Sequence, residues 1–109
     1  MADLTQREAE IHAGASGNDI GWAVKQLHLG GRVRRRGWNG VGKGMYLFLV
    51  PGSTFVVQGD RTMGIACPEL VDTAIYYHAH VDMKTAQGYV VPWLCSQNDL
   101  LSLDWELHS

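Results

Sequence analysis

A glycine-rich segment over residues 37–43 has the residue types that hold phosphate groups. Its spacing, G-x-x-x-x-G-K, is the first half of a phosphate-binding loop, in which backbone N–H groups and a lysine surround the phosphates. Gly44 stands where that loop needs Ser or Thr for magnesium, and the residues that follow favour a strand. A glycine-rich hairpin turn is therefore the better interpretation. Trp38 on this turn either stacks on a base or packs in the core.

His78, His80 and Asp82 alternate along one predicted strand, so their side chains share a face. Cα atoms two residues apart in a strand are separated by roughly 6.5 to 7 Å, and such side chains can converge on zinc. A solvent-facing sheet surface carries polar residues at the same period, which is the alternative. Ser96 is a conceivable nucleophile, but the G-x-S-x-G pattern is absent around it, and a helix N-cap explains its position.

Five of the nine basic residues fall close together in the sequence. They are Arg32, Arg34, Arg35, Arg36 and Lys43. Guanidinium groups bind phosphates through paired hydrogen bonds, so this segment suits a compact anion such as a pyrophosphate. The alternative is a solvated edge strand that is guarded by charge.

Aromatic, amide and carboxylate side chains are concentrated near the C-terminus. They are Trp93, Asn98, Asp99, Asp104 and Trp105. With Trp38 and the arginines they provide rings for a base, amides and carboxylates for ribose hydroxyls, and guanidiniums for phosphate. Because no convincing catalytic triad accompanies them, the sequence indicates nucleotide binding without cleavage.

The elements that must position these residues belong to the α+β class, as a small antiparallel β-sheet with an N-terminal helix and a short C-terminal helix. Asp19 is the expected N-cap of the first helix, and Gly30 with Gly31 ends it. The apolar stripe of that helix is Ile20, Ala23, Val24 and Leu27. Ser96 and Asp99 form a capping-box-like start for the second helix, which is expected to run through Leu103.

Period-two patterns predict the strands. They are expected over residues 32–36, 45–50, 54–58, 73–84 and 89–93, with a last edge strand over 105–108. The stretch 59–72 shows little alternation and is predicted to be a long loop. Residues 85–88 form the turn of a hairpin, in which Gly88 supplies the unusual dihedral angle.

Length and composition restrict the class of protein. A chain of 109 residues fits one small domain, expected over residues 18–109 after a polar extension over 1–17. The net charge of −2 excludes a general binder of nucleic acid polymers. Cys67 and Cys95 lack redox or zinc spacing, which suggests reduced thiols in the cytosol. No apolar run is long enough for a membrane span, so we expect a cytoplasmic protein without a membrane partner.

Four sequence blocks resemble the second Thoeris anti-defence family of phage proteins. They are Gly37-Trp38-Asn39-Gly40 with Gly44-Met45-Tyr46, then Met83-Lys84-Thr85-Ala86-Gln87-Gly88, then Val91-Pro92-Trp93-Leu94-Cys95-Ser96-Gln97-Asn98-Asp99-Leu100-Leu101, and finally Asp104-Trp105. The third block is the most specific. The similarity covers about residues 18–107 and leaves the first 17 residues outside it.

The resemblance implies a non-enzymatic sponge for a nucleotide signal. Such a protein sequesters the cyclic ADP-ribose-type signal of a bacterial Thoeris TIR protein. The resemblance also implies that cyclic dinucleotides can bind at a second site, as in some members of the family. By the same resemblance we expect a homotetramer that acts in the cytoplasm of an infected bacterium, with no cofactor. A small domain has little interior for a nucleotide, so a cleft between subunits is the expected pocket.

The family's motifs fall on particular residues of this chain. Its WNG turn corresponds to Trp38, Asn39 and Gly40, its PWLxSQxD segment to Pro92, Trp93, Leu94, Ser96, Gln97 and Asp99, and its final acid and tryptophan to Asp104 and Trp105. Gln87 departs from the family, where an aspartate is common, and His78 and His80 have no counterpart in it. The ligand-binding residues expected from both arguments are Arg36, Trp38, Asn39, Trp93, Ser96, Gln97, Asn98, Asp99, Asp104 and Trp105.

Two other functions stay open on the sequence alone. One is a metal-dependent hydrolase that degrades the nucleotide, for which His78, His80, Asp82 and Ser96 are the motivating residues. The other is an inhibitor that binds a host protein directly through the segment 59–72.

Overall fold

The computed structural model describes residues 17–38 and 44–108. These residues divide into two compact units, one formed by the described residues up to Leu49 and from Val81 to His108, and the other by Val50–His80. Both units contain antiparallel strands and short helices, which confirms the predicted α+β class. No helix in the described ranges is long and apolar enough to cross a membrane.

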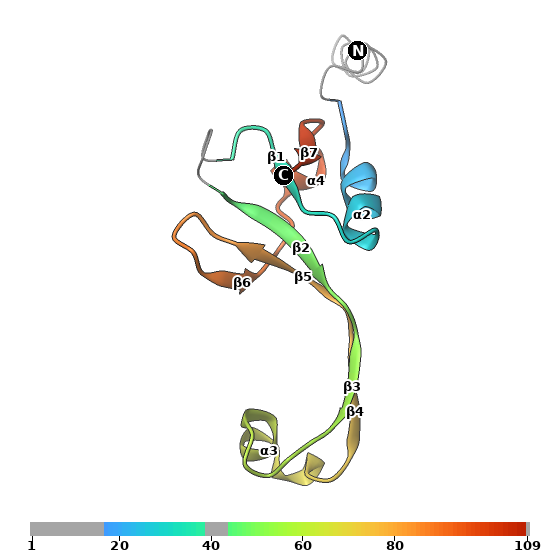
Figure 1. Cartoon of the computed structure of the whole chain (residues 1–109), viewed down its shortest axis with the longest axis vertical. Coiled ribbons are helices and arrows are strands. Elements are labelled where there is room, and N and C mark those ends of the chain that lie inside the picture. The colour runs from blue at the N-terminus through green and yellow to red at the C-terminus, as the bar shows by residue number, and fades with distance from the viewer. Residues whose placement is uncertain (1–16, 39–43, 109) are drawn as a thin grey trace. The chain divides into compact units, whose positions relative to one another are not determined.

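A five-stranded sheet forms most of the first unit. Its order is β6 (Val90–Pro92), β5 (His80–Lys84), β2 (Tyr46–Val50), β1 (Val33–Arg35) and β7 (Trp105–Leu107) (Figure 1). Strand β7 lies at an edge of the sheet, as predicted. Strand β1 does not, because it lies between β2 and β7. The interpretation of the arginine-rich strand as a charge-guarded edge is therefore wrong, since an edge depends on pairing partners that are distant in sequence.

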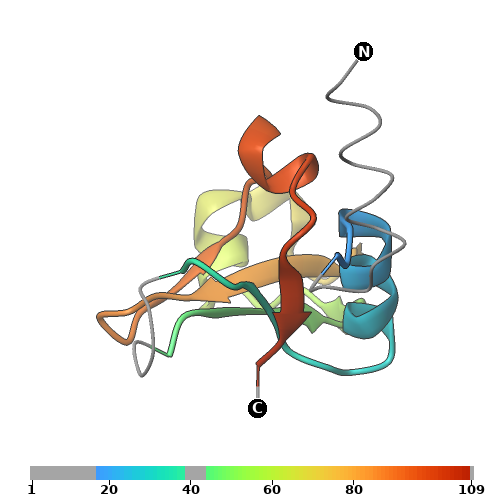
Figure 2. The ribbon, with the colours of Figure 1, turned by 90° about the horizontal axis from the view of Figure 1, so that it is seen from above.

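Helix α2 (Ile20–His28) packs beside β1 and β7 (Figure 2). Oδ1 of Asp19 accepts a hydrogen bond from the backbone N–H of Trp22 at 2.9 Å, which confirms the predicted N-cap. Gly30 follows the helix with a φ of 86°, a conformation that favours glycine. The predicted stripe needs one correction, because Val24 is 42% exposed and Trp22 packs against the core instead. The buried face is thus rotated about the helix axis, away from Val24 and toward Trp22.

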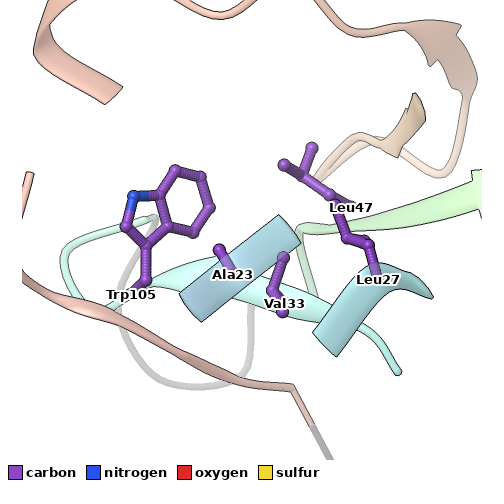
Figure 3. Close-up of a cluster of buried hydrophobic side chains, with 5 residues drawn as sticks. All are labelled: Ala23, Leu27, Val33, Leu47 and Trp105. Atoms are coloured by element: carbon purple, nitrogen blue, oxygen red, sulfur yellow. The ribbon is translucent and has the colours of Figure 1, made fainter. Parts of the chain in front are cut away.

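The hydrophobic core of this unit is built from α2 and three strands. Ala23, Leu27, Val33, Leu47 and Trp105 are all at least 95% buried and form one cluster (Figure 3). Trp105 provides the largest side chain in it. Because strand side chains alternate, the core face of the sheet holds Val33 and Leu47, and the opposite face holds their neighbours Arg34 and Tyr46.

The second unit is a two-stranded antiparallel ribbon with two short helices. Strand β3 (Ser53–Val56) pairs with β4 (Ala74–Tyr77), and Phe55 lies opposite Ile75. The predicted loop over 59–72 instead contains α3 (Thr62–Ala66) and the 3₁₀ helix η1 (Pro68–Leu70) (Figure 1). Both helices are too short for a helical period to show in the sequence. Gly64 of α3 is buried against the backbone of Gln58, where a side chain has no room.

The predicted strand over 73–84 is wrong in one respect, since it is two strands. Strand β4 ends at Tyr77 and pairs with β3, whereas β5 begins at His80 and pairs with β6. Extended backbone on both sides of the break preserves the alternation of side chains, so the sequence pattern does not reveal the change of partner.

The C-terminal elements follow the prediction with one adjustment of length. The hairpin turn between β5 and β6 forms at residues 85–88, where Gly88 has a φ of 96° and donates to the Thr85 carbonyl at 3.0 Å. Helix α4 (Gln97–Leu100) starts at the predicted cap Ser96, but it ends at Leu100 and does not reach Leu103.

Candidate ligand-binding surface

Three tryptophans that are distant in sequence meet in the first unit. The ring centroids of Trp38 and Trp105 are 5.4 Å apart at an interplanar angle of 75°, and those of Trp93 and Trp105 are 6.1 Å apart at 87°. These are edge-to-face contacts, the arrangement that the charge distribution of aromatic rings favours. Trp105 is fully buried, while Trp38 and Trp93 are half-buried. Trp105 thus supports the other two rings from inside the core.

Three hydrogen bonds, two with Asn18 and one with Asp99, hold Trp105 in position. Its backbone N–H donates to the carbonyl of Asn18 at 3.1 Å, and Nδ2 of Asn18 donates back to the Trp105 carbonyl at 3.1 Å. The indole Nε1–H donates to the backbone carbonyl of Asp99 at 3.1 Å. Because the last bond reaches α4, the tryptophan contacts and the short C-terminal helix form one rigid assembly.

Arg35 binds two of the predicted site carboxylates at once. Its Nε donates to Oδ1 of Asp104 at 2.9 Å, and its Nη1 donates to Oδ1 of Asp99 at 3.0 Å. Its side chain is only 25% exposed. The hydrogen bond to Asp104 and then the bond to Asp99 raise the pKa of Arg35 against the opposing effect of burial. Arg35 is therefore an internal clamp between β1 and the C-terminal segment, and its charge is already balanced by two anions.

The turn after β1 lies beside the same clamp. The backbone N–H of Arg36 donates to the Asp104 carbonyl at 3.0 Å, and that of Trp38 donates to the Arg35 carbonyl at 3.1 Å. The Arg36 side chain is exposed and makes no ion pair with any described residue. Asn39 lies outside the described residues, as does most of the glycine-rich segment 37–43.

The start of α4 presents polar groups next to the tryptophans. Oγ of Ser96 accepts a hydrogen bond from the backbone N–H of Asp99 at 3.1 Å, which confirms the predicted N-cap. Gln97 and Asn98 follow it and are exposed. The structure thus brings together Arg36, Trp38, Trp93, Asp99 and Asp104 with this helix start. We call this group of residues the tryptophan surface.

The histidine pair belongs to a different part of the chain. His78 packs edge-on against Tyr76 with ring centroids 4.8 Å apart, and His80 lies 5.2 Å from the ring of Tyr77. In the ranges that the structure describes, no three His, Cys, Asp or Glu side chains are grouped so that they could hold a metal ion.

Two features of the structure were missed by sequence reasoning. The first is the clamp role of Arg35, which was grouped with its neighbours because all carry the same charge. The second is a cavity of about 310 Å³ in the second unit, lined by Phe55, Val56, Val57, Gln58, Arg61 and Met63. Its only sequence signal was the apolar run 55–57, and none of its lining residues was among the expected ligand-binding residues.

Fold and side chains together define a small α+β domain with a rigid aromatic and charged surface. Residues 18–108 match the family profile described as Thoeris anti-defense 2-like domain. The chain is also 34% identical over 90 residues to Thoeris anti-defense 2 of Bacillus phage SP01, which covers 83% of this chain and 93% of that relative. The chain belongs to the Thoeris anti-defense 2-like family. This membership supports a phage protein that counteracts Thoeris defence.

Proposed function

We propose that this protein captures a cyclic ADP-ribose-type signalling nucleotide at the tryptophan surface and holds it without cleaving it. Captured signal no longer reaches the Thoeris effector, so the defence stays silent. The observation that carries the proposal is the pair of half-buried rings, Trp38 and Trp93, both fixed edge-to-face on the buried Trp105. Rings held in place before binding lower the ordering cost of capture.

Each part of such a ligand has a partner of fitting chemistry on this surface. A base stacks on an aromatic ring, for which Trp38 is exposed enough and backed by the core. Arg36 provides an exposed guanidinium for a phosphate oxygen. Gln97 and Asn98 offer amides to ribose hydroxyls. We assign Asn39 to the same ligand on the strength of its place next to Trp38 in the chain.

The engaged state of the polar groups supports binding over catalysis. The hydroxyl of Ser96 already accepts from the Asp99 N–H as a helix cap. Both Asp99 and Asp104 use Oδ1 to bind Arg35, whose raised pKa keeps it protonated and unable to accept a proton. Groups held in this way form a fixed wall for a ligand.

We propose further that the protein is a homo-oligomer, as a tetramer, and that neighbouring copies complete the pocket. A nucleotide-sized pocket typically takes roughly 300 to 1,000 Å³, whereas the tryptophan surface is one wall. Large apolar side chains are exposed for such contacts, among them Leu94 at 89%, Ile65 at 68% and Tyr76 at 57%. Cyclic dinucleotides are included as further ligands of this assembly.

Recovery of the ligand after capture tests the proposal. The purified protein is incubated with cyclic ADP-ribose-type nucleotide, freed of unbound ligand, denatured, and the released molecule is weighed by mass spectrometry. We expect the intact nucleotide in a fixed ratio to protein. An altered product that accumulates beyond that ratio contradicts the sponge and favours the hydrolase.

A further inference from the structure

The face of the five-stranded sheet opposite the core holds a second group of interacting side chains. They are Arg32, Arg34, Tyr46, Lys84 and His108, which we call the Tyr46 cluster. Cζ of Arg32 lies 4.7 Å from the centroid of the Tyr46 ring, and Nζ of Lys84 lies 5.7 Å from it. The Arg32 guanidinium and the Lys84 ammonium therefore both lie close to the same ring.

His108 contacts both the Tyr46 ring and the Arg34 guanidinium. The rings of His108 and Tyr46 have centroids 4.6 Å apart and are tilted by 31°. Nη1 of Arg34 lies 3.4 Å from Nδ1 of His108. Three cationic side chains, Arg32 and Arg34 from the segment of β1 and Lys84 from β5, therefore lie against the Tyr46 and His108 rings.

Two acidic residues share this face with the cations. Glu106 lies directly opposite Arg34 in the β1 and β7 ladder and binds its Nε at 3.1 Å. Asp82 lies on the same face of β5, two residues before Lys84. Burial, and then the charges of Arg32, Arg34 and Lys84, lower the pKa of His108. The three cations therefore lie close enough to His108 to disfavour its protonated form.

The need to protect a sheet edge does not explain these cations. Strand β1, which carries Arg34, has hydrogen-bonded neighbours on both sides. On an interior strand a cationic side chain can serve a cross-strand pair, as Arg34 does with Glu106, or a ligand.

We propose that the Tyr46 cluster is a binding site for a small phosphorylated anion, with a diphosphate group as the chemistry it fits best. Guanidinium and ammonium groups bind phosphate oxygens, and Arg32, Arg34 and Lys84 supply three such groups against the Tyr46 and His108 rings. Nζ of Lys84 also donates to the Gly44 carbonyl at 3.3 Å. The Tyr46 ring already carries Arg32 over it and His108 stacked near it, so recognition is by charge and not by stacking of a base.

This site is separate from the tryptophan surface. Side chains alternate along β1, so Arg35 points to the clamp with Asp99 and Asp104, while Arg34 points to the other face. The inference therefore does not rest on the proposed function, and each can fail without the other.

Titration with inorganic pyrophosphate tests the site, with calorimetry for affinity and NMR of the His108 ring for location. We expect saturable binding of one pyrophosphate per chain at physiological salt. The His108 ring signals should shift, and the pKa of His108 should rise, because a nearby anion favours the protonated imidazole. Lys84→Gln and Arg32→Gln should each weaken binding about tenfold or more, while preserving much of the side-chain length.

Arg61→Gln, in the second unit, is the matched control and should leave the affinity unchanged. Trp38→Ala should also leave pyrophosphate binding intact, even though it impairs capture of the cyclic nucleotide. Binding that survives both Lys84→Gln and Arg32→Gln, or that shifts the Trp38 indole signal and not His108, overturns the site. Displacement of pyrophosphate by a short single-stranded oligonucleotide at equal phosphate concentration overturns the assignment to a small anion and favours a polymer.

Discussion

Arg35 donates from Nε to Oδ1 of Asp104 at 2.9 Å, and this bond connects the interior strand β1 to the segment that follows α4. The same guanidinium binds Asp99, so one cation neutralises two carboxylates that stand next to the tryptophans. Without it the two carboxylates would repel each other beside the start of α4. The clamp therefore sets the position of the groups that we assign to ligand binding.

Arg35→Gln should lower the free energy of unfolding by about 2 kcal/mol, because it leaves two partly buried carboxylates without their counter-charge. Denaturant unfolding measures this loss. Arg34→Gln is the control, since the Arg34 and Glu106 pair is about one third exposed and should cost less than about 1 kcal/mol. Equal losses of unfolding free energy in the two variants would show that the ion pairs of Arg35 stabilise the fold no more than the pair of Arg34 with Glu106.

Trp38→Ala should weaken capture of the cyclic nucleotide by about 1 to 3 kcal/mol, the usual contribution of one stacked base. Isothermal titration measures this loss. Tyr89→Ala removes another aromatic ring that is 70% exposed at the hairpin turn, and it should leave the affinity unchanged. An unchanged titration together with a lowered melting temperature would assign Trp38 to the core alone.

Ser96→Ala should destabilise the start of α4 by about 1 kcal/mol, because the Asp99 N–H loses its acceptor. Hydrogen exchange of the Asp99 amide reports this directly. Ser96→Asp restores a capping acceptor and should restore both protection and ligand capture. If Ser96 were instead a nucleophile, both variants would lose hydrolysis of the nucleotide, whatever their helix stability.

Local signals in the sequence predicted the ends of elements well. Asp19, Ser96 and Gly88 act within three or four residues of their own position, so the residue type and its neighbours suffice to predict the bond or the turn. Gly30 ends α2 for the same reason.

Relationships between distant residues were not predictable in this way. The period-two pattern continues through His78 and Ala79, although the strands on either side pair with different partners. Arg35 has the same charge as its neighbours, and only the register of β1 with β7 places it beside the C-terminal carboxylates. The sequence therefore predicted the residue types of the tryptophan surface but not the clamp that fixes them.

His108 should make stability depend on pH. Its pKa is lowered in the folded protein below the ordinary value of 6.5, so the unfolded chain binds a proton more readily. With respect to His108, the folded state is therefore most stable above pH 6.5. It loses this stability as the pH falls from 6.5 through the lower folded pKa. The melting temperature of the wild type should therefore fall more steeply than that of His108→Gln between pH 7.5 and pH 5.5. Parallel curves would contradict the shift.

The ribbon of the second unit should be an interface between copies of the chain. A two-stranded ribbon is marginally stable in water by itself, and every residue of β3 is exposed. Val56 and Tyr76, at 56% and 57% exposure, lie on the same face of it, since Thr54 pairs with Tyr76 and Val56 with Ala74. Contact with a second copy would cover this face.

Val56→Lys should therefore lower the molar mass in multi-angle light scattering, because a buried ammonium in such a contact has no partner. Ser53→Lys is the matched control, because it adds the same charge to an exposed position on the other face of β3, and it should leave the molar mass unchanged. Capture of the cyclic nucleotide should fall together with the mass if the pocket is completed by neighbouring copies. A variant that dissociates into monomers but keeps full affinity would place the whole pocket within one chain. An unchanged molar mass would show that the interface lies on another surface.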